Sequence, residues 1–331
     1  ALITGGTGFA GSFLAEYLSL KGFDVAVTGL EKGPDLTAFS AASSFRFFAV
    51  DVCDEQAVFS VIRAFRPERL YHLAAQSNVP YSFRCPKHTF EVNVFGTINV
   101  LEAVAKLAPN CRVLVTCSAE EYGLVDPSQN PINEMHPLRP SNPYAVSKVA
   151  QDMVSFQYHI TNKLYVVRVR AFNHIGPRQS PSFVVSSFAK QVAEIEVGKR
   201  KPILKVGNLD AQRDFTDVRD VVKAYSSALE SLPPGSVANV CSGRAIRIAE
   251  VLRILLSKTT ATIRVEKDPA LLRPLDAPVI IGDPSYIRKT TGWVPTIDIE
   301  QSIADTLDYW RTKVRQDERN RKVNEISPQG W

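Results

Sequence analysis

Ala1-Leu-Ile-Thr-Gly-Gly-Thr-Gly-Phe-Ala-Gly11 opens the chain and decides what kind of fold it can form. An apolar run ends at Thr4, glycines recur every three residues, and a helical pattern continues from Ser12 to Leu20. Glycine in such a turn permits positive φ, close approach of the backbone to a pyrophosphate, and tight packing of helix on strand. Free amides at the start of the helix bind phosphate. The stretch therefore predicts a strand–turn–helix unit that holds a dinucleotide, in preference to a plain glycine turn. The residues expected to line it are Gly5, Thr7, Gly8, Phe9 and Gly11.

Short apolar runs alternate with helical patterns downstream of this unit, as is typical of a parallel sheet covered on both faces. The expected strands are Leu2–Thr4, Val25–Thr28, Phe45–Val50, Arg69–Leu73, Arg112–Thr116 and Tyr165–Arg170. The expected helices are Ser12–Leu20, Glu55–Ala64, Thr89–Leu107 and Tyr144–Thr161. This order predicts an α/β fold built on a doubly wound (Rossmann) parallel sheet.

Beyond Arg170 the alternation becomes irregular, because prolines interrupt residues 171–216. We expect loops and one helix there, Phe183–Val197, followed by a helix at Asp217–Glu230 and a strand at Ser236–Cys241 that returns to the sheet. Helices dominate from Ile246 to Trp310. We therefore predict a dinucleotide-binding domain from 1–170 and 217–241, a smaller interleaved substrate-binding lobe from 171–216 and 242–310, and a frayed tail at 311–331.

The composition narrows the class of protein. The 331 residues include 45% hydrophobic and 22% charged residues, with a net charge of +5 and no basic tract interleaved with aromatics. Nucleic acid is therefore not an expected partner. The five cysteines have no metal-ligand spacing, and no His, Asp or Glu cluster has it either, so we expect no metal and reduced thiols in a cytoplasmic protein. We also expect no membrane span and no signal peptide.

Tyr144 and Lys148 are four residues apart in Ser141-Asn-Pro-Tyr-Ala-Val-Ser-Lys148, so a helix would place them on one face. The ammonium is expected to lower the pKa of the phenol and to make it a proton donor or acceptor for a sugar oxygen. Ser118 and Glu120 follow the Arg112–Thr116 strand, at the sheet edge where ligands bind. Ser118 can donate to a substrate oxygen, and Glu120 adds a carboxylate.

The end of the second strand bears on the choice between NAD and NADP. It reads Val27-Thr-Gly-Leu-Glu-Lys32. Glu31 favours NAD, whereas Gly29 with Lys32 favours NADP. Asp51, after the third strand, can accept a hydrogen bond from the adenine amine.

Taken in order, these motifs resemble the extended short-chain dehydrogenases/reductases that modify nucleotide sugars. The remaining motifs of the resemblance are His72-Leu-Ala-Ala-Gln-Ser77, Asn93-x-x-Gly-Thr97, Arg170-Ala-Phe-Asn-His-Ile-Gly-Pro-Arg178, Gly207-Asn-Leu-Asp-Ala-Gln-Arg-Asp-Phe215, Leu272-Arg-Pro274 and Gly292-Trp293. Within that branch the chain is most similar to GDP-mannose 4,6-dehydratases and GDP-4-keto-6-deoxymannose reductases. The match spans nearly all of residues 1–310.

The resemblance implies roles for individual residues. Tyr144 would be the acid/base at O4 of the sugar, Lys148 would hold the nicotinamide ribose, and Ser118 would orient O4. Further cofactor contacts would come from Lys32, Asp51, Val52, Leu73, Ala74 and Ala75. Substrate contacts would come from Gln76, Asn173, Asn208, Arg213 and Arg273, of which Asn208 is the one expected to read the base or its ribose.

Two reactions remain open on these residues. Glu120 stands where a dehydratase of this branch removes the C5 proton, whereas the stretches Phe172–Gln191 and Lys205–Val222 are closer to the reductases. We predict NAD(P)H-dependent reduction of the C4 ketone of a GDP-4-keto-6-deoxy-hexose, with NADP(H) favoured and NAD(H) possible. The alternatives are a GDP-mannose 4,6-dehydratase, another nucleotide-sugar epimerase or reductase, and a catalytically idle cofactor-sensing scaffold. A homodimer is expected by analogy.

Overall fold

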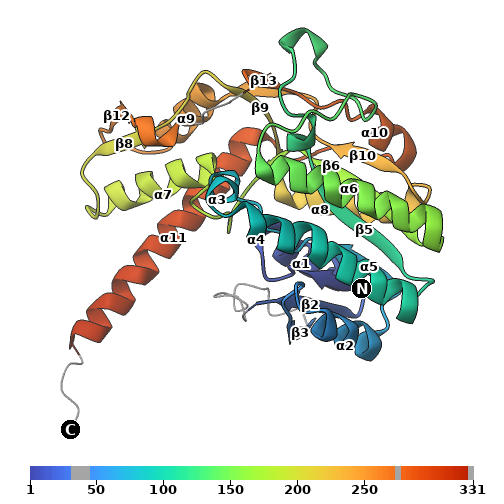
Figure 1. Cartoon of the computed structure of the whole chain (residues 1–331). Helices are drawn as coiled ribbons and strands as arrows, with labels where there is room; N and C mark the ends of the chain where they lie inside the picture. The colour runs from blue at the N-terminus through green and yellow to red at the C-terminus, as the bar shows by residue number, and fades with distance from the viewer. Residues whose placement is uncertain (31–44, 273–276, 327–331) are drawn as a thin grey trace.

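The computed structural model describes residues 1–30, 45–272 and 277–326. Seven parallel strands form its main sheet, in the order β10-β6-β5-β4-β1-β2-β3. The strands are β1 (Leu2–Thr4), β2 (Val25–Gly29), β3 (Phe45–Ala49), β4 (Arg69–His72), β5 (Arg112–Ser118), β6 (Tyr165–Ala171) and β10 (Val237–Val240). The chain starts at the middle of this sheet and winds outward in both directions, so the predicted doubly wound fold is confirmed (Figure 1).

Helices cover both faces of the main sheet because the strands are apolar on both sides. On one face α1 (Phe9–Leu20) packs beside α8 (Val218–Ser231) in a core that includes Leu14 and Val221. On the other face lie α2 (Glu55–Phe65), α5 (Gly96–Leu107) and α6 (Pro143–Asn162), over a core that includes Leu101. The carboxyl ends of the strands lie between these two layers of helices, and ligands of such sheets bind there.

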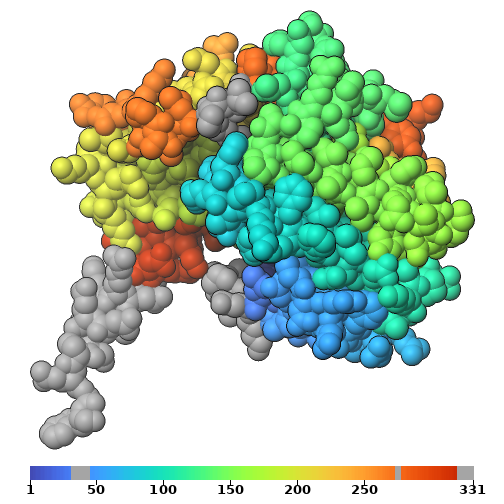
Figure 2. Space-filling view, viewed as in Figure 1, coloured from blue at the N-terminus to red at the C-terminus, as the bar shows by residue number. Residues whose placement is uncertain are grey.

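The second part of the structure lies beside the main sheet (Figures 1 and 2). Its helices α7 (Val184–Glu196), α9 (Ile248–Leu256) and α11 (Ile299–Ile326) enclose a separate apolar core. Its strands are β7 (Asn173–Ile175), β8 (Ile203–Val206), β9 (Gln212–Asp217), β11 (Ala245–Arg247), β12 (Arg264–Lys267) and β13 (Val279–Ile280). A further helix, α10 (Ser285–Thr291), packs on α8 and β10. The separate core supports our division into two lobes, whose boundaries we continue to propose.

Our expectation of only loops and one helix between 171 and 216 is wrong, since β7, β8 and β9 lie there. These strands are short and pair with distant segments: Arg213 of β9 lies opposite Ile246 and Ile280. No local pattern carries that information.

Two helices also differ from expectation. The region expected to form one helix at Thr89–Leu107 is α4 (Pro86–Phe90), a π-helical turn (Glu91–Phe95) and α5, after the short helix α3 (Val79–Arg84). The expected frayed tail is wrong as well, because α11 continues to Ile326. Trp310 and Val314 are buried in the second core and hold this helix in place past its first turns.

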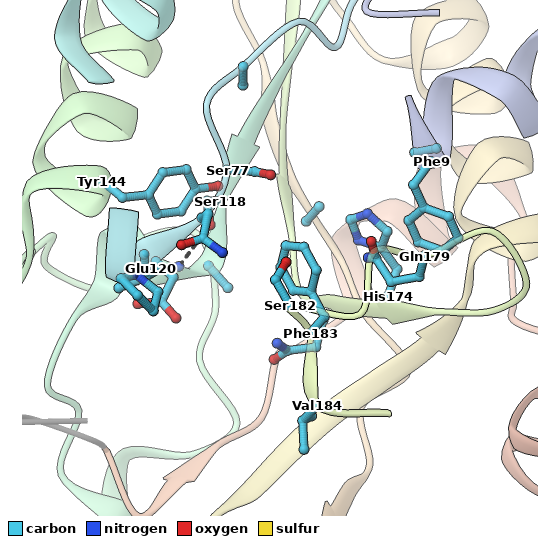
Figure 3. A pocket seen from close by; sticks show the side chains of 18 of the residues that line it. Phe9, Ser77, Ser118, Glu120, Tyr144, His174, Gln179, Ser182, Phe183 and Val184 are labelled. Atoms are coloured by element: carbon cyan, nitrogen blue, oxygen red, sulfur yellow. Dashed lines mark hydrogen bonds between the residues drawn. The ribbon is translucent and has the colours of Figure 1, made fainter. Parts of the chain in front are cut away.

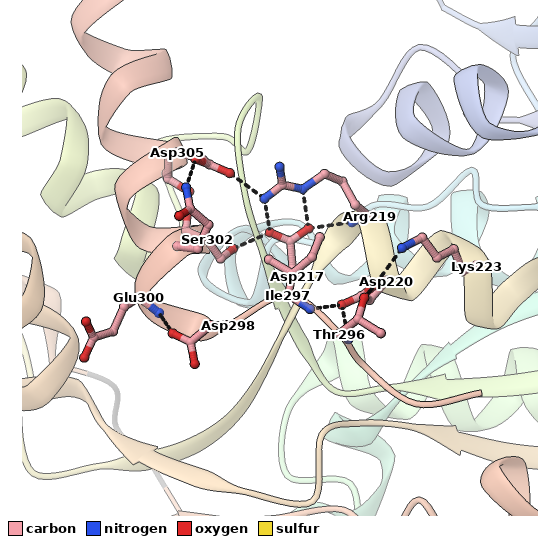
Figure 4. A network of polar contacts seen from close by, with 12 residues as sticks. Asp217, Arg219, Asp220, Lys223, Thr296, Ile297, Asp298, Glu300, Ser302 and Asp305 are labelled. Carbon is pink, nitrogen blue, oxygen red and sulfur yellow. Dashed lines mark hydrogen bonds and ion pairs between the residues drawn. The ribbon is translucent and has the colours of Figure 1, made fainter. Parts of the chain in front are cut away.

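A polar network joins α8 to the start of α11 (Figure 4). Asp217 caps α8, accepts two hydrogen bonds of 2.8 Å from the Arg219 guanidinium, and accepts another of 2.6 Å from Ser302. Arg219 also donates to Asp305 at 2.6 Å. The carboxylate of Asp220 accepts from the backbone amides of Thr296 and Ile297 at 2.7 Å each. These bonds, most of them partly buried, connect the two lobes through residues that are far apart in the sequence.

In the ranges given above, no helix is both long and apolar enough to cross a bilayer.

Candidate active site

A cavity of about 1370 Å³ follows the carboxyl edge of the main sheet and continues into the second lobe. It is lined by the predicted cofactor residues Gly5, Thr7, Gly8, Phe9, Gly11, Asp51, Val52, Leu73, Ala74, Ala75, Tyr144 and Lys148. The predicted residues Ser118, Glu120, Asn173, Asn208 and Arg213 also line it. Lys32 and Arg273 lie outside the described residues. Figure 3 shows Tyr144, Ser118 and Glu120 on one side of the cavity, across from Phe9 and His174.

The glycine turn is a cradle that side chains would fill. Gly5 has φ +66°, and a Cβ there would lie 2.8 Å from the backbone of Ala74. A Cβ on Gly11 would lie only 2.3 Å from the carbonyl oxygen of Gly5. Gly8 caps α1 without a side-chain hydrogen bond, so the first amides of the helix remain available to an anion. The turn therefore fits the diphosphate of a dinucleotide, as the sequence predicts.

Tyr144 and Lys148 are brought together by the first two turns of α6. The Lys148 Nζ lies 5.9 Å from the centre of the Tyr144 ring. It donates to the carbonyl oxygen of Thr116 at 2.9 Å and to Gln151 Oε1 at 2.7 Å. An ammonium has three donors, so one is left for a ligand in the cavity that Lys148 lines. Gln151, which fixes the lysine, was not foreseen.

Burial controls the charge of both groups. It lowers the pKa of Lys148 to about 8, because the charged ammonium is taken out of water. Burial also raises the pKa of Tyr144 well above its ordinary value, although a hydrogen bond with Ser118 acts in the opposite direction. Our expectation that Lys148 would bring the pKa of the phenol down is therefore wrong for this geometry, in which desolvation is the larger effect. Burial therefore favours the neutral phenol over the phenolate.

Glu120 lies in the 3₁₀ turn Ala119–Tyr122 that follows β5. Its Oε2 accepts a hydrogen bond of 3.1 Å from Asn142 Nδ2. The other end of the same amide, Asn142 Oδ1, caps α6 by accepting from the Ala145 amide at 2.8 Å. One side chain thus links the start of the helix that carries Tyr144 to the carboxylate of Glu120. Asn142 precedes a proline at the start of a helix, which is a recognisable capping signal.

A buried ion-pair network holds the turn that begins at Ser118. Glu121 accepts from the Ser118 amide at 2.8 Å, completing the capping box Ser118-x-x-Glu121, a signal that the sequence does contain. Arg170 pairs with Glu121 at 3.1 Å and with Asp152 at 2.8 Å. Burial and the neighbouring Asp152 raise the pKa of Glu121. Cys117, Glu121 and Asp152 have ligand atoms within 4.8 Å of one another. Arg170 and Arg168, which also pairs with Asp152, already balance the two carboxylates, which favours an ion-pair network over a metal.

The substrate end of the cavity departs from prediction at Gln76. Its Nε2 donates to Thr89 Oγ1 at 3.0 Å, its Oε1 accepts from the Asn78 amide at 2.6 Å, and it is not among the residues that line the cavity. Gln76 therefore holds its own loop, and its assignment to substrate is corrected. Arg213 is buried, and its Nη1 donates to the carbonyl oxygen of Ala277 at 2.8 Å.

Many residues that line the cavity were not predicted from the sequence, among them His174, Gln179 and Lys205. His174 stacks on Phe9 with 5.6 Å between ring centres, which joins β7 to the glycine turn. Gln179 and Lys205 also line the cavity. Their positions depend on how the second lobe folds against the first, and no spacing in the sequence indicates them.

The comparisons with known proteins agree with this geometry. A family model described as GDP-mannose 4,6 dehydratase matches residues 2–306. A GDP-6-deoxy-D-mannose reductase from Pseudomonas aeruginosa is 38% identical over 251 residues, which cover 76% of this chain and 83% of that protein. A GDP-mannose 4,6-dehydratase from Vibrio cholerae serotype O1 is 29% identical over 348 residues, covering 93% of this chain and 92% of that one.

Solved structures are similar over the same extent. The structure of RMD from Pseudomonas aeruginosa complexed with NADPH has a TM-score of 0.83 and 32% identity, and covers 94% of this chain and 99% of that chain. A UDP-glucose 4-epimerase from Thermus thermophilus in complex with NAD has a TM-score of 0.81 and 30% identity, over 94% and 98% of the two chains.

Proposed function

The chain belongs to the GDP-mannose 4,6-dehydratase family, and from that premise we propose that it reduces the C4 ketone of a GDP-4-keto-6-deoxy-hexose. The family and its relatives are NAD(P)-dependent reductases and dehydratases of nucleotide sugars. The observation that carries the choice of reduction is the 38% identity to a GDP-6-deoxy-D-mannose reductase. Tyr144 lines the cavity beside Ser118, and its burial favours the neutral phenol, the form that can donate a proton to a ketone oxygen.

Each residue then has a defined task. NAD(P)H bound along the glycine turn would supply the hydride. Tyr144 donates its proton to O4, and Ser118 orients O4 by a hydrogen bond. Lys148 holds the nicotinamide ribose through the donor that Thr116 and Gln151 leave over. Asn173, Asn208 and Arg213 bind the nucleotide at the other end of the cavity.

We favour NADP(H) as the cofactor. Gly29 ends β2, where an acidic residue would select the free ribose of NAD. A Cβ at this position would lie 2.2 Å from Thr7 Oγ1, so an acidic side chain there would have to displace Thr7. Structures with NADPH and with NAD are both similar to this chain, and they support a nicotinamide cofactor of either kind.

The 4,6-dehydratase is retained as a second candidate because of Glu120. Its carboxylate lines the cavity close to Tyr144 and Ser118 and is held by Asn142 (Figure 3). Such a group can remove a proton from the carbon next to a ketone, a step that reduction does not need.

Replacement of Glu120 by Gln separates the two reactions. We expect Glu120→Gln to reduce the 4-keto-6-deoxy sugar within about threefold of the wild-type rate, because Gln keeps the hydrogen bonding but cannot take a proton. The assay supplies GDP-mannose alone, and then the keto sugar with NADPH or NADH, and follows the products. Turnover of GDP-mannose without added reduced cofactor, lost by about 100-fold or more in Glu120→Gln, would establish dehydration instead.

We also propose that α6 forms a dimer interface with a second copy of the chain. Val146, Met153 and Ile160 recur every seven residues along α6 and are 40%, 43% and 49% exposed, and Phe156 on the same helix is 39% exposed. Phe95, just ahead of α5, is 59% exposed. Large apolar side chains collected on paired helices favour burial against a partner.

The double change Met153→Glu and Phe156→Glu is expected to leave a folded monomer. Two carboxylates buried without partners raise the dimer dissociation constant at least about 100-fold. Sedimentation velocity at several protein concentrations measures the change. Met135→Glu is the control, because Met135 is 89% exposed and is not part of α6. A monomeric wild-type protein, or a double variant that stays dimeric, would exclude this interface.

A further inference from the structure

Among the described residues that line the cavity, the Lys and Arg side chains are Lys148, Lys205 and Arg213. Lys148 is engaged at the cofactor end, which leaves Lys205 and Arg213 of this set at the nucleotide end. A nucleoside diphosphate linked to a sugar carries two negative charges, and of these two cations the proposed function uses only Arg213. Lys205, on β8, has no role so far.

The backbone of Lys205 is held on both sides. Gln191, a buried residue of α7, accepts from the Lys205 amide at 3.0 Å and donates to its carbonyl oxygen at 3.1 Å. On the other side β8 pairs in register with β12, and the Asp268 amide donates to the carbonyl oxygen of Val206 at 2.8 Å. The lysine side chain therefore starts from a fixed point on the cavity wall.

Gly207 brings a second segment against this wall. A Cβ there would lie 2.7 Å from the carbonyl oxygen of Leu271, so only glycine permits the approach. Leu271 and Leu272 line the cavity beside Lys205. The end of β8 and the segment that follows β12 thus form one continuous surface toward the ligand.

The ammonium of Lys205 forms an ion pair with Asp268. Its Nζ lies 3.2 Å from Asp268 Oδ2, and Asp268 Oδ1 accepts from the Ala270 amide at 3.0 Å. Asp268 is not among the residues that line the cavity. The two side chains are 54% and 24% exposed, and an ion pair this exposed contributes little to stability. A phosphate oxygen also makes a charge-assisted hydrogen bond with an ammonium. Because an ammonium has three donors, a ligand can engage the lysine while Asp268 remains bound.

We propose that Lys205 is a second cationic contact for the diphosphate of the nucleotide sugar, and that Asp268 partly neutralises its ammonium while the site is empty. The inference rests on the proposed nucleotide-sugar function and extends it to a residue that had no role in the site.

Calorimetric titration of the whole protein with GDP, without cofactor or turnover, tests this contact. Lys205→Met is expected to raise the GDP dissociation constant about tenfold, and Lys205→Arg to stay within about threefold of wild type. Lys190→Met is the matched control, because Lys190 lies in the same lobe, pairs with Glu194 at 3.7 Å and does not line the cavity. It should bind GDP as the wild type does.

Asp268→Asn is expected to change the affinity for GDP in the opposite direction from Lys205→Met. Asn preserves the cap on the Ala270 amide but removes the negative charge beside the ammonium. GDP should therefore bind about two- to fivefold more tightly, since less charge is neutralised in the empty site. Weaker binding in Asp268→Asn, comparable to that of Lys205→Met, would show that the intact ion pair matters rather than the charge of the lysine, and would overturn the proposal.

Two further outcomes are decisive. If Lys205→Met binds GDP within twofold of wild type, Lys205 is not a ligand contact. If it loses affinity for guanosine as much as for GDP, the contact is with the nucleoside and the diphosphate assignment is wrong. Failure of the proposed reaction is distinguishable: a protein that binds GDP through Lys205 but reduces no keto sugar retains this inference and loses the proposed function.

Discussion

Tyr144→Phe is expected to lower kcat for ketone reduction by a factor of about 10² to 10⁴, which is the range that general acid catalysis contributes. The change removes one oxygen and leaves the ring packed as before. It does not touch the hydrogen bonds of Lys148 to Thr116 and Gln151. The dissociation constant for NADPH should therefore stay within about twofold of wild type. Steady-state rates and a fluorescence titration of the cofactor measure the two quantities separately.

Tyr158→Phe is the matched control on the same helix. Its hydroxyl donates to Glu102 at 2.6 Å, and Tyr158 does not line the cavity. This variant should lose a little stability and keep its kcat. Turnover of Tyr144→Phe within tenfold of wild type would rule out Tyr144 as the acid.

Gly11→Ala is expected to weaken cofactor binding by about 100-fold or more, since it deforms the turn that receives the diphosphate. The added Cβ would lie 2.3 Å from the oxygen of Gly5 and 2.7 Å from the Cα of Gly6. Both are backbone atoms, so no side chain can rotate away to relieve the contact. Overpacking of this kind also costs about 1–3 kcal/mol in the free energy of unfolding. Titration with NADPH and NADH, together with urea unfolding, measures both effects and the preference between the cofactors.

Gly22→Ala measures the loss of stability caused by a side chain at positive φ when that side chain contacts nothing. Gly22 has φ +83° just after α1, and a Cβ there would meet no atom within 4 Å. The variant should lose about 1 kcal/mol of stability through strain at positive φ and bind the cofactor normally. Normal binding of NADPH by Gly11→Ala would mean that the cofactor does not use this turn.

The main sheet was predictable because its evidence is local. Each strand is a short apolar run, and each covering helix has its own periodicity, so β1 to β6 appear within a residue or two of their expected bounds. The second lobe was less predictable. β8 and β9 are four and six residues long, and they pair with segments tens of residues further along the chain. Pairing of that kind is decided by the folded chain, because β8 (Ile-Leu-Lys-Val) and β9 (Gln-Arg-Asp-Phe-Thr-Asp) are not bounded apolar runs in a regular alternation with helices.

The residues of the site likewise fall into those that the sequence predicted and those that only the folded structure placed. The spacing of Tyr144 and Lys148 placed both on one face of α6, and the order of the motifs indicated the cofactor turn and Ser118. The pKa of Tyr144 could not be read from spacing, because it depends on burial by parts of the chain that are distant in sequence. Gln76, expected at the substrate, is held by Thr89 instead.

The residues of the opening turn, Thr4 to Gly11, were sufficient to predict a dinucleotide-binding unit, and together with Tyr144 and Lys148 they predicted a nicotinamide enzyme. The conformation of the turn is a property of a few consecutive residues, and only glycine satisfies it. Which groups are charged, which amides are already bonded, and which lysine faces the nucleotide are properties of packing between the two lobes. Asn142 beside Glu120 and Lys205 in front of Asp268 acquire their roles only when segments remote in the chain are brought within about 3 Å of one another.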